Sequence, residues 1–235
     1  MKKAVMCGIA ALLVICFALA AGYVSDYYRA DEAAAAAMAG AVEEKGMLCF
    51  GEEGAEAGLI FYPGGKVEHT AYAPLMNDLA ARGVFCVLID MPLNLAVLDM
   101  NAAEGIAQQY PAINRWYIGG HSLGGSMAAA YAAEHAEELE GLILLAAYST
   151  ADLSGAGIDV LSLYGSEDCV LNMQKYGEYR ANLPSDLQEH VIEGGNHAGF
   201  GDYGPQDGDG VETISKAEQW RITADRIIQM IETGR

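Results

Sequence analysis

The stretch Gly119-Gly120-His121-Ser122-Leu123-Gly124-Gly125 decides how this chain folds. It follows an apolar run, residues 115–118, that predicts a strand, and precedes an alanine-rich stretch, residues 126–135, that predicts a helix. A serine between glycines at such a junction indicates a sharp turn, with its hydroxyl exposed at the positive end of the helix. The pattern predicts that Ser122 is a nucleophile, and a glycine-rich turn with a capping serine is the alternative.

The rest of the chain alternates apolar runs with amphipathic stretches, as repeated strand–helix–strand units do. The expected strands are residues 47–50, 58–62, 84–89, 116–119, 142–146, 160–164 and 189–192. The expected helices are residues 72–82, 95–109, 122–135, 172–182 and 215–231. Such apolar strands are typical of a sheet covered on both faces. We expect an α/β fold: a doubly wound, mostly parallel sheet with helices on both faces. The link 147–159 is too short for a sizeable lid.

Two more polar residues follow strands of the expected sheet. Asp168 comes after residues 160–164, and His197 comes after residues 189–192, in Gly194-Gly195-Asn196-His197. A serine hydroxyl needs a base within about 3 Å to act as a nucleophile at neutral pH. We expect His197 to be that base and Asp168 to orient it. The other candidates for the acid are Glu167, Asp152 and Asp202.

These motifs resemble those of the α/β-hydrolases. The likeness rests on Gly-His-Ser-Leu-Gly, on Tyr164-Gly165-Ser166-Glu167-Asp168, on the histidine loop, and on the order serine, aspartate, histidine. It covers residues 47–231 and is most similar to small lidless bacterial hydrolases of the dienelactone-hydrolase kind. It implies hydrolysis of a carboxylic ester through an acyl-enzyme, without a cofactor. A thioesterase, amidase or peptidase would use the same residues, and a catalytically silent surface binding protein is a further alternative.

The reaction also needs two N–H groups that stabilise the developing oxyanion. The N–H of Leu123 supplies one, because this residue follows the nucleophile. The resemblance implies a second donor from the loop Pro63-Gly64-Gly65-Lys66, where we expect Gly65, with Lys66 as the alternative. The side chain of His121 is expected to point away from the site. The possible pocket residues are Lys66, His69 and Tyr203.

Charge and cysteine content exclude several partners. The formal net charge of -19 argues against nucleic acids and anionic membrane surfaces as partners, which need positive charge. Five scattered cysteines give neither a zinc signature nor a disulfide framework. The aspartate-rich loop 200–210 does not have the ligand spacing of a helix-loop-helix calcium site. We therefore expect no metal and no cofactor.

The N-terminus predicts a targeting or anchoring segment. Lys2 and Lys3 precede an uncharged run over residues 4–24, which as a helix spans about 30 Å. Positive charge before the run and mainly acidic residues after it place the N-terminus in the cytoplasm and the domain outside. The run is either an uncleaved signal anchor or, given Ala18-Leu19-Ala20, a cleavable signal peptide that would leave the protein secreted. We expect residues 1–24 as this segment, 25–46 as a stalk or linker and 47–235 as the domain, with the oligomeric state open.

Overall fold

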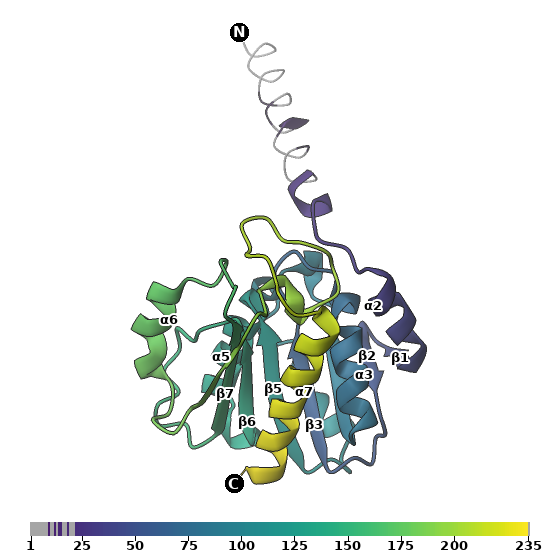
Figure 1. The fold of residues 1–235 in the computed structure, drawn as a ribbon. Coiled ribbons are helices and arrows are strands. Elements are labelled where there is room, and N and C mark those ends of the chain that lie inside the picture. Colours follow the sequence, from purple (N-terminus) through teal and green to yellow (C-terminus); the bar gives the residue numbers. More distant parts are fainter. Residues whose placement is uncertain (1–8, 10–11, 13, 16–17, 19–21, 235) are drawn as a thin grey trace.

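The chain, seen in a computed structural model that describes residues 9, 12, 14–15, 18 and 22–234, is built on one sheet (Figure 1). The eight strands found in these residues are β1 (Ala41–Glu44), β2 (Met47–Phe50), β3 (Ala57–Tyr62), β4 (Val84–Ile89), β5 (Arg115–His121), β6 (Gly141–Leu145), β7 (Asp159–Gly165) and β8 (Gln188–Ile192). Their order is β1-β2-β4-β3-β5-β6-β7-β8. β1 and β2 run antiparallel to their neighbours, and all other pairs are parallel. The carboxyl ends of six strands therefore meet at one edge, called here the carboxyl edge.

Helices cover both faces of the sheet. The α-helices are α2 (Glu32–Ala37), α3 (Ala73–Ala81), α4 (Ile106–Gln109), α5 (Leu123–Glu134), α6 (Met173–Tyr179) and α7 (Lys216–Thr233). The short 3-10 helices are η1 (Met38–Gly40), η2 (His69–Tyr72), η3 (Pro92–Asn94), η4 (Ala96–Leu98), η5 (Ala136–Glu138), η6 (Arg180–Asn182) and η7 (Ala198–Phe200).

Strand β4 shows how the sequence builds two core layers. All six of its residues are buried, and successive side chains point to opposite faces of the sheet. Cys86 and Leu88 join the layer under α3 and α7, whereas Phe85 and Val87 join the layer under α4 and α5. An apolar residue is therefore needed at every position, which gives the uninterrupted run in the sequence. The α/β fold predicted from these runs is confirmed, and each of the seven expected strands is present.

The expected helix over residues 95–109 does not form as one helix. This segment holds η4, a series of turns and the four-residue helix α4. Gly105 has φ 76°, a left-handed conformation that interrupts a helix. The Tyr62 hydroxyl donates to the Met100 carbonyl and accepts from the Ala103 N–H, so the segment is bound to the sheet instead.

Part of the expected stalk belongs to the domain. Residues 41–44 form β1, which pairs antiparallel with β2 from Ala41 opposite Phe50 to Glu44 opposite Met47. Helix α2 lies before it and buries Ala34 completely. The alanine run over residues 33–37 predicts a helix, and α2 forms there, but it packs on the domain rather than forming a separate stalk. Strand β1 was not predicted, because its pairing with β2 leaves no local signal.

The expected membrane segment over residues 1–24 lies mainly outside the described residues. In the part of the chain that the structure describes, no helix has the length and apolar character needed to cross a membrane.

Candidate active site

Ser122 occupies the turn between β5 and α5. Its backbone has φ 52°, a left-handed conformation that strains a residue with a side chain, and its N–H donates to the Leu145 carbonyl (2.9 Å). Gly120 and Gly124 allow this turn to close: a Cβ on Gly120 would lie 2.6 Å from the Gly124 carbonyl carbon. A Cβ on Gly124 would meet the Tyr62 and Pro63 carbonyl oxygens. The sequence thus specifies a tight, strained turn at the carboxyl edge.

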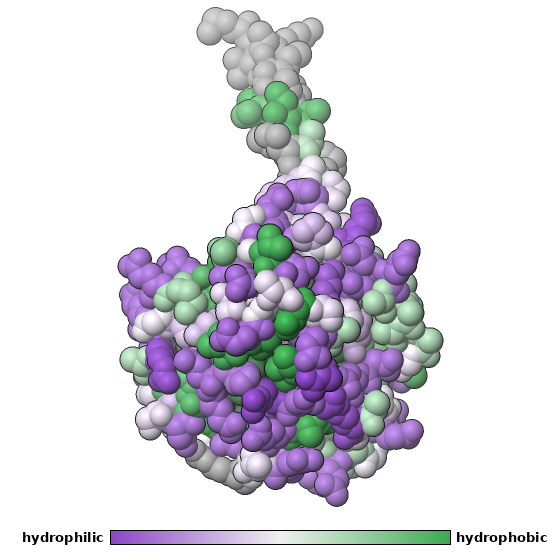
Figure 2. Space-filling view, in the orientation of Figure 1, coloured by the Kyte–Doolittle hydropathy of each residue, from purple (hydrophilic) through white to green (hydrophobic). Residues whose placement is uncertain are grey.

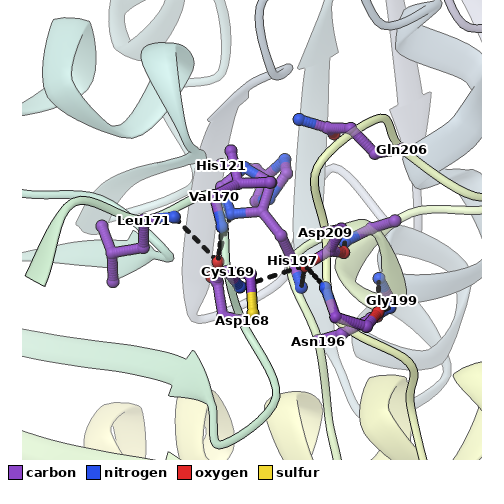
Figure 3. A network of polar contacts seen from close by, with 12 residues as sticks. His121, Asp168, Cys169, Val170, Leu171, Asn196, His197, Gly199, Gln206 and Asp209 are labelled. Carbon is purple, nitrogen blue, oxygen red and sulfur yellow. Dashed lines mark hydrogen bonds and ion pairs between the residues drawn. The ribbon is translucent and has the colours of Figure 1, made fainter.

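His197 and Asp168 come from different loops and form a buried pair (Figure 3). Nδ1 of His197 lies 2.9 Å from Oδ2 of Asp168, and their side chains are 2% and 1% exposed. The other carboxylate oxygen of Asp168 accepts the N–H groups of Val170 (2.9 Å) and Leu171 (2.8 Å). These contacts hold the carboxylate in one orientation, so it can fix the imidazole ring in turn.

Ser122 lies at the same cavity as His197. Ser122 and His197 both line a cavity of about 250 Å³, whose wall also includes Tyr148, Leu171 and Asn172. Nε2 of His197 is buried and has no hydrogen-bond partner within the described residues, Ser122 included. Hydrogen bonds between catalytic groups are often long without substrate. The arrangement leaves a basic nitrogen free to accept a proton at the cavity that Ser122 lines.

The other candidate acids are used elsewhere in the fold. Asp202 accepts the Ala34 N–H of α2 (2.9 Å) and binds Nζ of Lys216 (3.3 Å). Asp152 binds its neighbour Ser154. The Glu167 carboxylate accepts the hydroxyl of its neighbour Ser166 (3.0 Å). Of the four acids, it is Asp168 that contacts the ring of His197.

The candidate oxyanion donors lie side by side. In the loop after β3, the Gly64 N–H donates to the Tyr72 hydroxyl (3.0 Å) and the Lys66 N–H donates to the Asn94 carbonyl (2.7 Å). A Cβ on Gly65 would lie 2.9 Å from Cδ2 of Leu123, so these two residues are in contact. Because its neighbours are engaged, Gly65 is the better candidate donor beside Leu123, and Lys66 is the weaker one.

The three expected pocket residues are not among those lining the cavity. Lys66 binds Asp26 (3.1 Å) in the N-terminal segment, and Nδ1 of His69 pairs with Asp90 (3.2 Å). Tyr203 is buried and packs against Tyr28, with their ring centroids 5.6 Å apart. All three help to fix loops around the carboxyl edge. The sequence does not predict the positions of Lys66 and Tyr203, because both contact residues 25–46, which were expected to form a stalk or linker apart from the domain.

Asp209 is a positioning residue that sequence reasoning did not single out. Its carboxylate accepts the N–H groups of Ala198 (2.8 Å), His197 (3.3 Å) and Cys169 (3.3 Å) (Figure 3). It therefore joins the loop that carries Asp168 to the loop that carries His197. Asp202, in the same loop, likewise accepts a backbone N–H, that of Ala34. Within the described residues, no cluster of three or more His, Cys, Asp or Glu side chains could hold a metal ion.

Replacing Asp209 with alanine should lower kcat/KM by about 10- to 100-fold, because the imidazole shifts when its loop loses these contacts. The matched control is Asp207→Ala, an exposed carboxylate two residues away, which should stay within twofold of wild type. Steady-state ester hydrolysis measures both. An equal loss in the two variants would mean that the loop as a whole, and not the Asp209 carboxylate, positions the pair.

The side chain of His121 was expected to point away from the site. It does not line the cavity, but its ring packs against the ring of His197. Its ring is 1% exposed and its centroid is 4.5 Å from that of His197. Nδ1 of His121 lies 2.8 Å from the Tyr72 hydroxyl, which already accepts the Gly64 N–H and so can donate its own proton to this nitrogen. Burial lowers the pKa of His121 well below 6.5, and the charge of nearby His197 lowers it further. The ring therefore stays neutral in the folded protein.

This neutral ring predicts a loss of stability in acid. In the unfolded chain His121 takes up a proton below about pH 6.5, whereas in the folded protein it does not. The free energy of unfolding should therefore fall with falling pH below 6.5, by up to about 1.4 kcal/mol per pH unit from this group. Urea unfolding between pH 4.5 and 7.5 measures the slope. His121→Gln should make it shallower, and an unchanged slope would contradict the assignment.

Comparisons with known proteins identify the family of this chain. A model of the alpha/beta hydrolase family matches residues 58–221. The fold and the site define a hydrolase, and the chain belongs to the alpha/beta hydrolase family. No curated protein matches the chain.

Several solved structures share the fold. Carboxylesterase CesB from Bacillus subtilis is 12% identical, with TM-score 0.59, covering 85% of this chain and 95% of that one. Thermogutta terrifontis esterase 2, phosphoramylated by tabun, is 12% identical, with TM-score 0.58 and coverage of 82% and 96%. The thioesterase domain from the curacin biosynthetic pathway is 11% identical, with TM-score 0.60 and coverage of 80% and 98%. Identities this low show the fold alone, and the narrower resemblance to dienelactone hydrolases stays a prediction.

Proposed function

We propose that this protein is a serine hydrolase that cleaves carboxylic esters through an acyl-enzyme, with Ser122 as nucleophile, His197 as general base and Asp168 as its orienting acid. The observation that carries the proposal is the buried pair of His197 and Asp168 (2.9 Å), on the same cavity as the strained turn of Ser122. Core packing does not require a buried histidine–aspartate pair beside a strained serine turn at the same cavity.

The proposed reaction has two halves. The Ser122 hydroxyl oxygen attacks the ester carbonyl carbon while Nε2 of His197 takes the hydroxyl proton. The N–H groups of Leu123 and Gly65 stabilise the carbonyl oxygen as it becomes negative. The alcohol leaves with the proton from His197, and Ser122 holds the acyl group. A water molecule, deprotonated by His197, then attacks this acyl-enzyme and releases the acid and the free Ser122 hydroxyl.

The cavity favours a small acyl group. A volume of about 250 Å³ is slightly below the usual range for sites that enclose drug-sized ligands. Its wall combines apolar side chains, such as Val170 and Leu171, with the polar Asn172. Two of the similar structures are named as esterases and one as a thioesterase domain. A thioester is therefore the second candidate substrate. Thioesterase, amidase and peptidase chemistry would use the same three residues.

The second part of the proposal concerns location. Residues 4–24 are uncharged and long enough to span about 30 Å as a helix. Lys2 and Lys3 before them and acidic residues after them favour a domain outside the cytoplasm, held to the membrane as a single-pass protein. Cleavage after Ala18-Leu19-Ala20 would instead release the domain, and the mass of the mature N-terminus distinguishes the two.

The test combines a covalent probe with a series of esters. A fluorophosphonate loses fluoride when a reactive serine hydroxyl attacks its phosphorus, so it should label the full chain, and tryptic mapping should find the label on Ser122. Hydrolysis of p-nitrophenyl esters from acetate to palmitate should be fastest for the short acyl groups. A folded protein that takes up no label would be the silent binding protein, and a preference for thioester analogues would support the second candidate.

A further inference from the structure

The N-terminal segment leaves the domain at the carboxyl edge. Tyr28 forms a parallel bridge with Val67: its N–H donates to the Lys66 carbonyl (2.8 Å), and its carbonyl accepts the Glu68 N–H (2.9 Å). Lys66 then reaches back to Asp26 (3.1 Å). The segment is therefore fixed against the same loop that carries the candidate oxyanion donor Gly65, and it rises from this end of the molecule, opposite the C-terminus (Figure 1).

Little chain separates this fixed point from the apolar run. Tyr28 lies four residues after Val24, where the uncharged run ends, and four residues span at most about 14 Å. A run embedded in a bilayer would therefore hold the carboxyl edge close to the lipid headgroups. Apolar atoms of this N-terminal segment are seen above the domain in Figure 2.

Exposed apolar side chains of the domain gather at the same edge. Six of its large exposed apolar residues follow the carboxyl ends of strands: Leu93, Val97, Leu98 and Met100 after β4, Met173 after β7 and Val211 after β8. Val211 is 80% exposed and Leu98 is 55% exposed. The other one given for the domain, Val42, lies on the edge strand β1. Exposed apolar residues gathered on one side of a protein mark an interaction surface.

The charge of the chain selects the kind of surface. A net charge of -19 repels anionic lipids, and Asp90 and Asp99 flank Leu93, Val97 and Leu98 in the sequence. Of the basic groups near this edge, Lys66 is paired with Asp26. An uncharged or zwitterionic headgroup layer is thus the surface that these residues fit.

We propose that the carboxyl edge docks on the surface of the bilayer that holds the N-terminal segment, and that the substrates are esters of amphiphiles in that bilayer. This inference rests on the proposed function in both parts, the serine ester hydrolase and the membrane segment. The residues after β4, β7 and β8 touch the headgroup layer, and the short tether keeps them there. Ser122 then faces the bilayer surface, so an ester reaches it by protruding from the lipid and need not cross bulk water.

The first experiment compares two substrates with the full chain in zwitterionic phosphatidylcholine vesicles. One is a fluorogenic acetate ester whose alcohol part carries a lipid tail, embedded in the vesicles, and the other is soluble p-nitrophenyl acetate, so the acyl group is small in both. The double variant Val97→Ser, Leu98→Ser should lower the ratio of embedded-ester to soluble-ester hydrolysis by tenfold or more. The matched control Val42→Ser, equally exposed but on β1, should leave the ratio unchanged. An unchanged ratio in the double variant would overturn the docking surface.

The second experiment measures orientation. A fluorophosphonate dye on Ser122 should transfer energy to acceptor lipids more efficiently than the same dye on a C-terminal tag. The reason is that the carboxyl edge and the C-terminus lie at opposite ends of the molecule (Figure 1). Equal transfer from both positions would overturn the proposal. Two further readouts show whether the proposed function itself has failed. If the protein does not float with vesicles, residues 4–24 do not insert in the bilayer. If it takes up no fluorophosphonate, it is not a serine hydrolase.

Discussion

Ser122→Ala should abolish ester hydrolysis, with kcat lower by about 10⁶-fold and no labelling by a fluorophosphonate. The reason is chemical: alanine has no oxygen to attack the acyl carbon, and His197 then has no hydroxyl to activate. The substitution removes one atom from a residue whose backbone is fixed by the Leu145 carbonyl, so the fold should persist. Initial rates with a short p-nitrophenyl ester and in-gel fluorescence of the probe measure the two effects.

Ser126 offers the matched control. It lines the same cavity, but its hydroxyl donates to the Tyr148 carbonyl (2.8 Å) and is not at the turn. Ser126→Ala should therefore keep the fluorophosphonate label. Full activity in Ser122→Ala, or a label that moves to Ser126, would refute the assignment of the nucleophile.

Asp168→Asn should lower kcat by about 10⁴-fold while leaving the fold intact. The Val170 and Leu171 N–H groups keep an oxygen of the side chain on their side, so the amide group of the asparagine faces Nδ1 of His197. The amide donates a hydrogen bond to Nδ1, which places the imidazole proton on Nε2. Nε2 then has no lone pair with which to accept the proton of Ser122.

The control for this prediction is Asp152→Asn, which replaces an acid of the same charge whose carboxylate accepts the N–H and the hydroxyl of Ser154. Its rate should stay within twofold of wild type. Circular dichroism of both variants checks that they are folded. If Asp168→Asn kept more than a tenth of the wild-type kcat, another group would have to orient His197.

The sequence predicts the sheet and the paired residues because both depend on local pattern. Val84 to Ile89 must be a strand buried on both faces, since an uninterrupted apolar run fits little else of that length. His197 and Asp168 follow strands, and parallel strands bring their carboxyl ends together whatever the loops do. The apolar spacing of residues 95–109 predicts a helix, but Gly105 and the hydrogen bonds of the Tyr62 hydroxyl impose turns.

Contacts between distant segments are what the sequence did not predict. The place of Tyr203 after the histidine loop predicts a pocket residue, but its ring packs against that of Tyr28, which lies 175 positions earlier in the sequence. Asp209 accepts four backbone N–H groups through its carboxylate, and such contacts leave no periodic signal. The positions of these residues follow from how loops and the N-terminal segment pack, which depends on the whole fold.

Strand β1 also bears on how this protein can be shortened. It pairs with the full length of β2, whose four residues, Met47 to Phe50, are apolar and buried. A protein that began at Gly46 would carry β2 as a bare outer strand, with unpaired N–H and carbonyl groups beside apolar side chains. Such a strand recruits the same strand of another molecule, which leads to dimers or aggregates. None of the four residues Ala41 to Glu44 is fully buried and two of them are glutamates, so a shortened protein that keeps β1 presents a more polar outer strand than one that begins at β2.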